Sequence, residues 1–235
     1  MTTVSQQLVT VYARIHAACN TAGRDLVTVR LLAVSKTFGA DAVVEAASAG
    51  QCDFGENYVA EGIEKIAAVR AHLGSAADLL RWHCIGPLQS NKTRPVAENF
   101  DWVQSIDRLK IAQRLSQQRP PQLPPLQVCL QVNIDGGANK SGVAPEAAAA
   151  LAREVSRLPR LRLRGLMAIP EPAPDFVAAC ALHASVKALF DQINSVGDLV
   201  APMDTLSLGM SADLEAASHA GSTMVRVGTA IFGRR

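Results

Sequence analysis

Short hydrophobic segments alternate with amphipathic segments along the whole chain. Several of the hydrophobic segments are almost continuous, as over Val128–Val132. Continuous runs of this length are typical of strands that are buried on both faces of a parallel sheet. The pattern predicts eight strands, which run over Val29–Lys36, Cys52–Gly55, Arg81–Ile85, Trp102–Ile106, Leu126–Ile134, Leu163–Ile169, Thr205–Leu208 and Met224–Val227.

Helical periodicity occupies the intervals between these strands. Leu151, Val155 and Leu158 recur at spacings of four and three, and residues 182–193 repeat the pattern. Such spacing gives a helix one hydrophobic side that can pack against a sheet. One more amphipathic helix is predicted ahead of the first strand, from hydrophobic positions at Val4, Leu8, Val11 and Ile15.

Eight strand–helix units in 235 residues predict a single (β/α)₈ barrel domain, residues 1–235, with an extra N-terminal helix. An open doubly wound sheet is the alternative, because periodicity alone cannot show that a sheet closes. The proline-rich segment Gln117–Pro125 has the composition of a stiff linker. We interpret it as a surface loop within one domain, because the strand–helix rhythm continues on both sides of it.

Composition and charge exclude several classes of protein. The formal net charge is +2 without a long block of one sign, so we expect no nucleic-acid partner. The five cysteines are far apart and form no C-x-x-C pair, which argues against a disulfide framework or a zinc site and favours a reducing cytoplasm. We find no signal-peptide pattern and no hydrophobic stretch of about 18 residues, and we therefore expect no membrane association.

The first strand ends on a lysine, Lys36, which follows the hydrophobic run of residues 31–34 and Ser35. Lysine is rarely buried without a partner, and burial favours its neutral amine. A neutral amine is a nucleophile that can form a Schiff base with a carbonyl group. The simpler interpretation is a side chain that extends from the strand end to solvent. The positions of the other polar clusters favour the first interpretation, since they also follow strand ends, where barrels collect their functional residues.

Two segments near the C-terminus have the character of a phosphate site. A glycine turn follows the seventh predicted strand, and Ser211 is placed to be the N-cap of the next helix. Gly228 and Thr229 follow the eighth strand. Barrels frequently bind phosphate with the loops after strands 7 and 8, and helix starts attract anions. The alternative is an ordinary capped helix and a tight turn.

A Schiff-base lysine together with a phosphate site indicates pyridoxal 5′-phosphate, which also needs a residue facing its pyridine nitrogen. Arg226 is placed for that role, two residues before Gly228 on the last strand. A cation there disfavours protonation of the ring nitrogen and weakens the ring as an electron sink. The alternative for Arg226 is a structural ion pair with a carboxylate such as Asp204 or Glu56.

Three other groups of residues carry weaker signals. Asn57 follows the second strand and could contact the ring or a substrate, or could simply start a helix. His83 could act as an acid or base, but a histidine bonded to a neighbouring backbone group is the stronger expectation. Basic residues in loops could receive anions at the rim, although we expect them to be solvated; these are Lys92, Arg94 and Lys140.

Taken together, the motifs resemble the pyridoxal phosphate homeostasis protein family, which is related to the N-terminal barrel of alanine racemase. The resemblance runs from about Leu31 to Arg234. Its motifs are the segments 33–37, 54–58, 82–92, 140–143, 164–167, 208–213 and 226–233.

The resemblance implies an alanine racemase-type barrel in which Lys36 holds the cofactor as an internal aldimine. It also implies that Ser211, Gly228 and Thr229 bind the phosphate and that Arg226 faces the ring. Asn57, and Met210 beside Ser211, complete the set of cofactor-binding candidates. The chain departs from the family where residues 37–39 lack a common lysine–proline pair and where Leu208 replaces a common methionine.

Two functions compete at this stage. The first is a homeostasis protein that stores or delivers pyridoxal phosphate without turnover, with apo-enzymes as recipients and a monomer as the expected state. The second is a small amino-acid racemase, which needs an acid/base on each face of the ring. Related racemases take the second of these from a tyrosine of another domain. We expect none here, because the sequence ends soon after its eighth strand and has only Tyr12 and Tyr58. A lysine-dependent aldolase is a third option.

Overall fold

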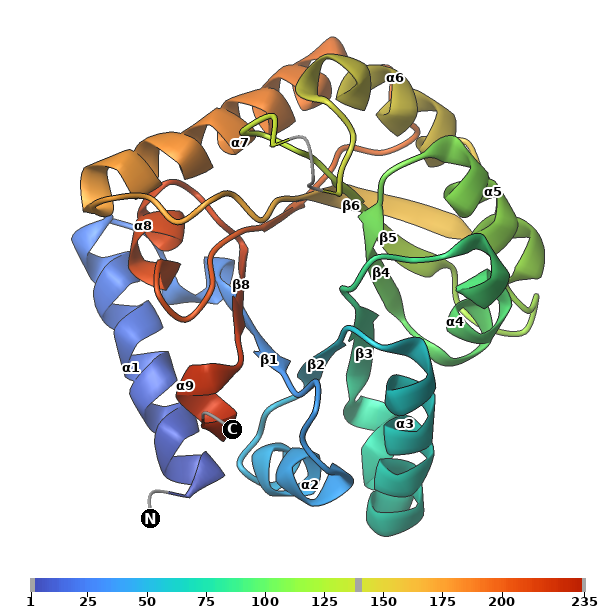
Figure 1. The fold of residues 1–235 in the computed structure, drawn as a ribbon, viewed down its shortest axis with the longest axis vertical. Helices are drawn as coiled ribbons and strands as arrows, with labels where there is room; N and C mark the ends of the chain where they lie inside the picture. The colour runs from blue at the N-terminus through green and yellow to red at the C-terminus, as the bar shows by residue number, and fades with distance from the viewer. Residues whose placement is uncertain (1–2, 138–140, 234–235) are drawn as a thin grey trace.

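The computed structural model describes residues 3–137 and 141–233, and it contains a closed barrel of parallel strands (Figure 1). Each strand bonds to the next in the chain, and the eighth pairs with the first. Closure confirms the barrel and excludes the open sheet. The strands are β1 Arg30–Val34, β2 Asp53–Glu56, β3 Arg81–Cys84, β4 Trp102–Ile106, β5 Leu126–Gln131, β6 Leu161–Met167, β7 Thr205–Ser207 and β8 Met224–Val227.

Helices surround the barrel in a ring (Figure 1). The predicted N-terminal helix is confirmed, with a capping box between Thr3 and Gln6 and a buried row that includes Leu8, Val11 and Ile15. It packs against α2, α8 and α9. The helices are α1 Val4–Thr21, α2 Ala40–Ser48, α3 Val59–Leu73, α4 Thr93–Asn99, α5 Leu109–Gln118, α6 Pro145–Ser156, α7 Phe176–Val196, α8 Leu214–His219 and α9 Thr229–Phe232, with short 3₁₀ turns at Leu26–Thr28, Gly74–Leu79 and Ser90–Lys92.

The proline-rich segment connects α5 to β5 within the barrel. Its anchor is Arg119, whose side chain is buried. The guanidinium donates from Nη1 to the carbonyl oxygens of Ala97 and Phe100, at 2.7 and 2.8 Å, and from Nε to that of Pro124 at 2.9 Å. These hydrogen bonds tie the loop to the α4–β4 connection of the same barrel.

Helix α7 is longer and more hydrophobic than the sequence analysis anticipated. Among the described residues it is the one helix whose length and mean hydropathy, 1.3, are compatible with a membrane span. Length and composition are weak evidence, because a barrel helix can satisfy them too. The face of α7 that includes His183, Val186 and Ile193 is buried in the fold, so we interpret α7 as part of the barrel wall.

The two faces of the strands have different compositions. On β8, Val225 and Val227 belong to the large hydrophobic core that includes residues of the surrounding helices, whereas Met224 and Arg226 alternate with them and are also buried. Since strand side chains alternate, this second set points into the barrel. TIM-barrel interiors are dominated by branched hydrophobic residues. In this barrel, buried polar side chains are packed beside a small cluster of Trp102, Cys129 and Met167.

Candidate functional site

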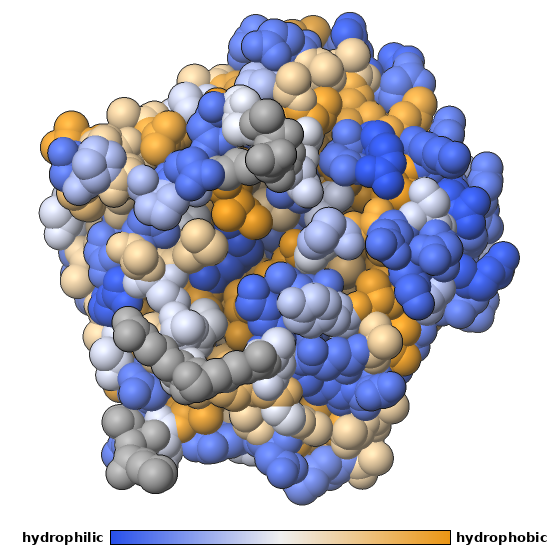
Figure 2. Space-filling view, viewed as in Figure 1, coloured by the Kyte–Doolittle hydropathy of each residue, from blue (hydrophilic) through white to orange (hydrophobic). Residues whose placement is uncertain are grey.

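All seven cofactor-binding candidates line one cavity at the carboxyl end of the strands. Its volume is about 350 Å³, within the range of about 300–1,000 Å³ that is usual for small-molecule sites. Figure 2 shows a recess of mixed hydrophilic and hydrophobic character near the middle of the visible face. The candidates in the lining are Lys36, Asn57, Met210, Ser211, Arg226, Gly228 and Thr229, and the other residues are Val34, Ile85, Ile169 and Ala212.

Lys36 lies beyond the end of β1 and its side chain is exposed, not buried. The expectation that the strand carries Lys36 into the hydrophobic core was therefore wrong. The strand ends at Val34, and Phe38 N–H donates to the Ser35 carbonyl at 3.1 Å, which turns the chain at Lys36. Lys36 lines both the main cavity and an adjoining one of about 340 Å³. Its amine can reach a ligand without leaving solvent.

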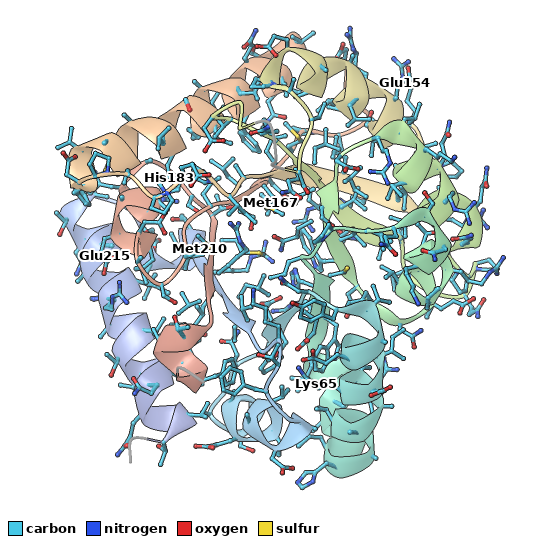
Figure 3. The ribbon with its side chains drawn as sticks, viewed as in Figure 1. Lys65, Glu154, Met167, His183, Met210 and Glu215 are labelled. Atoms are coloured by element: carbon cyan, nitrogen blue, oxygen red, sulfur yellow. The ribbon has the colours of Figure 1, made fainter. Side chains whose placement is uncertain are left out.

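A buried cluster of charges holds the backbone on both sides of Lys36. Lys65, on α3, donates from Nζ to Glu56 Oε1 at 2.6 Å, to Glu61 Oε1 at 3.0 Å and to the carbonyl oxygen of Ser35 at 2.7 Å. Ser35 Oγ donates to the same Glu56 oxygen at 2.6 Å. On the other side, the N–H of Thr37 donates to Glu61 Oε1. Figure 3 shows Lys65 beside α3.

This cluster stabilises an unfavourable backbone conformation. Thr37 has φ 73°, in the left-handed region that a β-branched residue rarely adopts. Such a conformation costs on the order of 1–3 kcal/mol and persists when its surroundings determine it. The hydrogen bond to Glu61 is part of those surroundings. Burial, the largest effect, raises the pKa of Glu56 above its ordinary value, although the hydrogen bonds from Lys65 and Ser35 lower it.

The loops after β7 and β8 bring two hydroxyl groups together. Thr229 Oγ1 donates to Ser211 Oγ at 3.2 Å, and Gly228 lies beside them in the cavity wall. Gly209 forms the turn before Ser211, with φ 84°, and a Cβ there would lie 2.4 Å from the Cβ of Ala217. Only glycine fits that turn, and so the loop can fold back over the barrel end.

Ser211 is not the N-cap of a helix, as we had expected. Helix α8 begins at Leu214, after a turn, and Asp213 occupies the cap position. The physical reason is a local competition: Asp213 Oδ1 accepts from Met210 N–H at 2.6 Å, which closes a turn over residues 210–213. The expected helix start at Ser211 therefore makes no contribution to anion binding.

His183, on α7, contacts the second oxygen of the Asp213 carboxylate. Its Nε2 lies 2.9 Å from Asp213 Oδ2. Burial raises the pKa of Asp213, but the hydrogen bonds from His183 and from Met210 N–H outweigh burial and hold this pKa below its ordinary value. Asp213 is thus a carboxylate at neutral pH, and it links the Ser211 loop to the barrel wall. In Figure 3, Met210 lies inside the helix ring and His183 lies near α7.

Arg226 is buried at the floor of the cavity. The alternative, an ion pair between Arg226 and Asp204 or Glu56, was wrong. Asp204 pairs instead with Arg164, at 2.7 Å, and Glu56 pairs with Lys65. Arg226 donates from Nη1 to the Ser207 carbonyl at 2.5 Å and to Ser207 Oγ at 2.8 Å, and from Nη2 to the Ala168 carbonyl at 2.8 Å. Burial lowers the pKa of Arg226 to about 10, which leaves it cationic at neutral pH.

Asn57 lies between the end of β2 and Tyr58, which is the N-cap of α3, so its side chain does not cap the helix. A close approach of two loops sets its position. A Cβ on Gly86 would lie 2.3 Å from the Asn57 carbonyl oxygen, so only glycine permits the contact. Ser105 Oγ holds Gly86 from the other side, at 2.6 Å from its carbonyl oxygen. Asn57 remains available to a ligand.

His83 does not bond to a neighbouring backbone group, as we had expected. It is fully buried inside the barrel, stacked on Trp102 at 5.0 Å, and its ring nitrogens contact Asp53 and Gln104. Lys92 and Arg94 are exposed, as expected, and Arg94 lies 3.7 Å from Glu98. Lys140 lies outside the described residues.

Sequence reasoning missed several residues that support the site, chiefly Glu61, Lys65 and Gln104. For Gln104 a signal was present, because it is a polar position inside a strand predicted to be buried. For Lys65 and Glu61 the only signal was an i,i+4 charge pair, which more often marks an exposed helix face.

The fold and the arrangement of this site define a barrel of the alanine racemase N-terminal type. A family model described as "Alanine racemase, N-terminal domain" matches residues 9–235. The chain is 57% identical over 236 residues to the pyridoxal phosphate homeostasis protein of Pseudomonas aeruginosa, which covers 100% of this chain and 97% of the relative. The Escherichia coli K12 protein of the same name is 51% identical over 235 residues, covering 100% and 98%.

Among solved structures, PipY of Synechococcus elongatus with PLP bound superposes with a TM-score of 0.80 at 33% identity, covering 98% of this chain and 100% of PipY. The chain belongs to the pyridoxal phosphate homeostasis protein family. Its resemblance to that family, inferred above from motifs, is thereby confirmed.

Proposed function

We propose that this protein binds pyridoxal 5′-phosphate in the cavity after β1, β7 and β8, through a Schiff base on Nζ of Lys36. It serves intracellular homeostasis of the cofactor, by storage or delivery in the cytoplasm, without turnover of its own. The observation that carries the proposal is the convergence of Lys36, Arg226 and the Ser211–Thr229 hydroxyl pair on one cavity of suitable size.

The residues present fit this cofactor chemically. Lys36 supplies an accessible amine for the aldehyde group. Ser211 and Thr229 supply hydroxyl donors for the phosphate. Because Gly228 has no side chain, the phosphate can come close to the backbone there. Arg226 supplies a fixed cation at the floor of the cavity, where it disfavours protonation of a pyridine nitrogen. When bound, the cofactor contributes an aldehyde and an aromatic electron sink.

The composition of the cavity favours storage over catalysis. Among the described residues that line it, Lys36 and Arg226 are the ionisable ones. Racemisation needs a proton donor and acceptor on opposite faces of the ring, and Arg226 remains cationic near neutral pH. Tyr58 lines the adjoining cavity beside Lys36, and Tyr12 donates to Gln51 at 2.8 Å elsewhere in the fold. Neither is a wall residue of the main cavity.

The holo-protein is expected to show no sustained turnover of alanine or other common amino acids and to transfer its cofactor to an apo-enzyme. The structural reason is the lack of a second acid/base group in the described cavity wall. Chirality, ammonia and keto-acid release should be followed during incubation with single enantiomers, and recovery of activity should be followed in a pyridoxal phosphate-dependent apo-enzyme. Multiple turnovers that Lys36→Ala abolishes would identify a racemase or related enzyme instead.

Pyridoxal without its phosphate is expected to bind much more weakly than the phosphorylated form. Hydrogen bonds to a charged group contribute about 1.5–3 kcal/mol each, so two hydroxyl donors correspond to a loss of at least roughly 100-fold. Equilibrium dialysis with both vitamers measures the ratio. The double variant Ser211→Ala/Thr229→Ala should reduce that ratio, whereas Ser195→Ala, an exposed serine on α7, should not. Equal affinities in the unmodified protein would exclude the phosphate site.

A further inference from the structure

A continuous chain of polar side chains crosses the interior of the barrel and ends at Arg226. It begins at Arg81, near the amino ends of the strands, and passes through Asp53, His83, Gln104 and Ser207. Of these, Asp53, His83, Gln104, Ser207 and Arg226 are buried, with exposed fractions of 5% or less. Side chains fill the interior of the barrel in Figure 3.

Every hydrogen bond between Arg226 and Asp53 runs in one direction. Arg226 Nη1 donates to Ser207 Oγ at 2.8 Å, and the Ser207 hydroxyl donates to Gln104 Oε1 at 2.7 Å. Gln104 Nε2 then donates to His83 Nδ1 at 3.0 Å. His83 Nε2 donates to Asp53 Oδ1 at 3.0 Å, and this carboxylate also accepts from Arg81 Nε and Nη2 at 2.7 and 2.6 Å.

This direction follows from the charge of His83. Burial, the largest effect, lowers the pKa of His83, so the neutral ring is favoured. A neutral ring must direct its single N–H to the Asp53 carboxylate, which leaves Nδ1 as an acceptor. The amide of Gln104 must then present its NH₂ group to His83 and its oxygen to Ser207. The second N–H of that amide points to Met224 Sδ, at 3.2 Å.

Every buried polar side-chain atom in this hydrogen-bonded series has a partner. Buried polar atoms without a partner exist elsewhere among the described residues, for example Glu56 Oε2 and His183 Nδ1, but none belongs to the residues of this series. Partly satisfied networks destabilise a core, whereas complete ones hold one arrangement of side chains. Branched hydrophobic residues are the usual filling of such a barrel, so this polar interior is a departure from the common pattern.

We propose that Gln104 and His83 are positioning residues that act through Ser207 and, together with two backbone carbonyl oxygens, hold the Arg226 guanidinium in a single orientation at the floor of the cofactor cavity. This inference rests on the proposed function, because it concerns the same cavity. Ser207 is the link: its hydroxyl accepts from Arg226 while its own proton points away, to Gln104. Loss of the Gln104 amide frees that proton to turn toward Arg226, and the guanidinium then has fixed acceptors only in the Ser207 and Ala168 carbonyl oxygens.

The first test measures the donor-to-acceptor direction of these hydrogen bonds in the unliganded protein. Nitrogen-15 NMR of the histidine rings distinguishes a protonated from an unprotonated ring nitrogen, with His83→Gln used to assign the signal. We expect His83 to carry its proton on Nε2 at neutral pH, with Nδ1 unprotonated. A proton on Nδ1 would require the opposite amide orientation and would overturn the proposal.

The second test is a double-mutant cycle on cofactor binding. Gln104→Met keeps the volume but removes the donor and the acceptor, and Arg226→Lys keeps the charge but removes the planar fork. We expect Gln104→Met to weaken binding of pyridoxal phosphate about tenfold, from the disordering of one charged hydrogen-bonding group. In the Arg226→Lys background the same change should weaken it less than about twofold, because coupled residues are not additive. Additive effects would overturn the proposal.

A buried serine outside the barrel interior provides the control. Ser116 on α5 is buried and donates to the Pro159 carbonyl at 2.5 Å, so Ser116→Ala also removes a buried hydrogen bond. It should lower thermal stability without changing the affinity or the absorption maximum of the bound cofactor, whereas Gln104→Met should change both. Ser207→Ala cuts the same chain and replaces Gln104→Met if that variant does not fold.

The same binding measurements separate the positioning role of Gln104 and His83 from the proposed function of the protein. Normal cofactor binding by the unmodified protein and by Gln104→Met would reject the positioning role while leaving the proposed function intact. Absence of cofactor binding in the unmodified protein would reject the proposed function, and the NMR result would still report on the direction of the chain.

Discussion

Lys36→Ala is expected to abolish the borohydride-stable attachment of pyridoxal phosphate and the yellow colour of the protein. A primary amine is required for a Schiff base, and Lys36 is the lysine of the main cavity lining. Borohydride reduction followed by peptide mapping should locate the label on the peptide that contains residue 36. Some non-covalent binding should persist in the variant, because Ser211, Thr229 and Arg226 remain.

Other lysines serve as controls for this assignment. Lys92 is exposed and lines a different cavity, so Lys92→Ala should leave the label unchanged. Lys65 is buried and engaged by two carboxylates and a carbonyl, and should not be labelled in the folded protein. A label found on Lys65, Lys92 or Lys140 would show that Lys36 is not the attachment point.

Lys65→Met is expected to lower the free energy of unfolding by about 3–5 kcal/mol, the usual cost of removing one partner from a buried ion pair. Lys65 and Glu56 have side chains that are 4% and 0% exposed, and their closest atoms lie 2.6 Å apart. Without the ammonium group, the Glu56 carboxylate stays buried with a single hydroxyl donor from Ser35. Urea denaturation followed by circular dichroism measures the difference.

The destabilisation should depend on pH with a defined sign. Burial already raises the pKa of Glu56 above its ordinary value of 4.5, and removal of Lys65 takes away a group that lowers it. When folding raises the pKa of a carboxyl group, the group contributes most to the free energy of unfolding at low pH, and this contribution is lost as the pH rises. The cost of Lys65→Met should therefore be smallest below about pH 4.5 and should grow as the pH rises through the folded-state pKa.

An exposed pair of the same type is the matched control. Lys187 Nζ lies 2.5 Å from Asp191 on α7, and these side chains are 38% and 55% exposed. Exposed pairs contribute about 0–1 kcal/mol, so Lys187→Met should have little effect at any pH. Equal effects of the two substitutions would mean that the buried Lys65–Glu56 pair contributes no more to stability than an exposed pair.

The sequence by itself determined the alternation of strands and helices and the identity of the candidate residues. Runs such as Val128–Val132 predict strands that are buried on both faces because two-sided burial removes alternation. Eight predicted strands separated by helices match one common architecture. The candidates Lys36, Ser211 and Gly228 were recognisable because each lies at or just beyond the end of a predicted strand, and the carboxyl ends of parallel strands meet at one end of a barrel.

Local sequence could not determine the conformation of these loops. Whether Ser211 caps a helix depends on Asp213, which closes a turn and is itself held by His183 from another helix. Whether Lys36 is buried depends on where β1 ends, and that is set by the turn after Ser35 and by Lys65 and Glu61 from α3. Contacts over 24 to 30 residues decide both outcomes.

Only the tertiary structure decided which polar residues in buried strands act together. Asp53, His83, Gln104, Ser207 and Arg226 come from five different strands, and in the sequence nothing links these five polar positions to one another. Barrel closure turns their side chains toward one interior, where each needs a partner because an unpaired buried polar group is costly. Composition and spacing determine that these strands form. Closure of the sheet determines which side chains meet, since register and curvature are properties of the whole barrel.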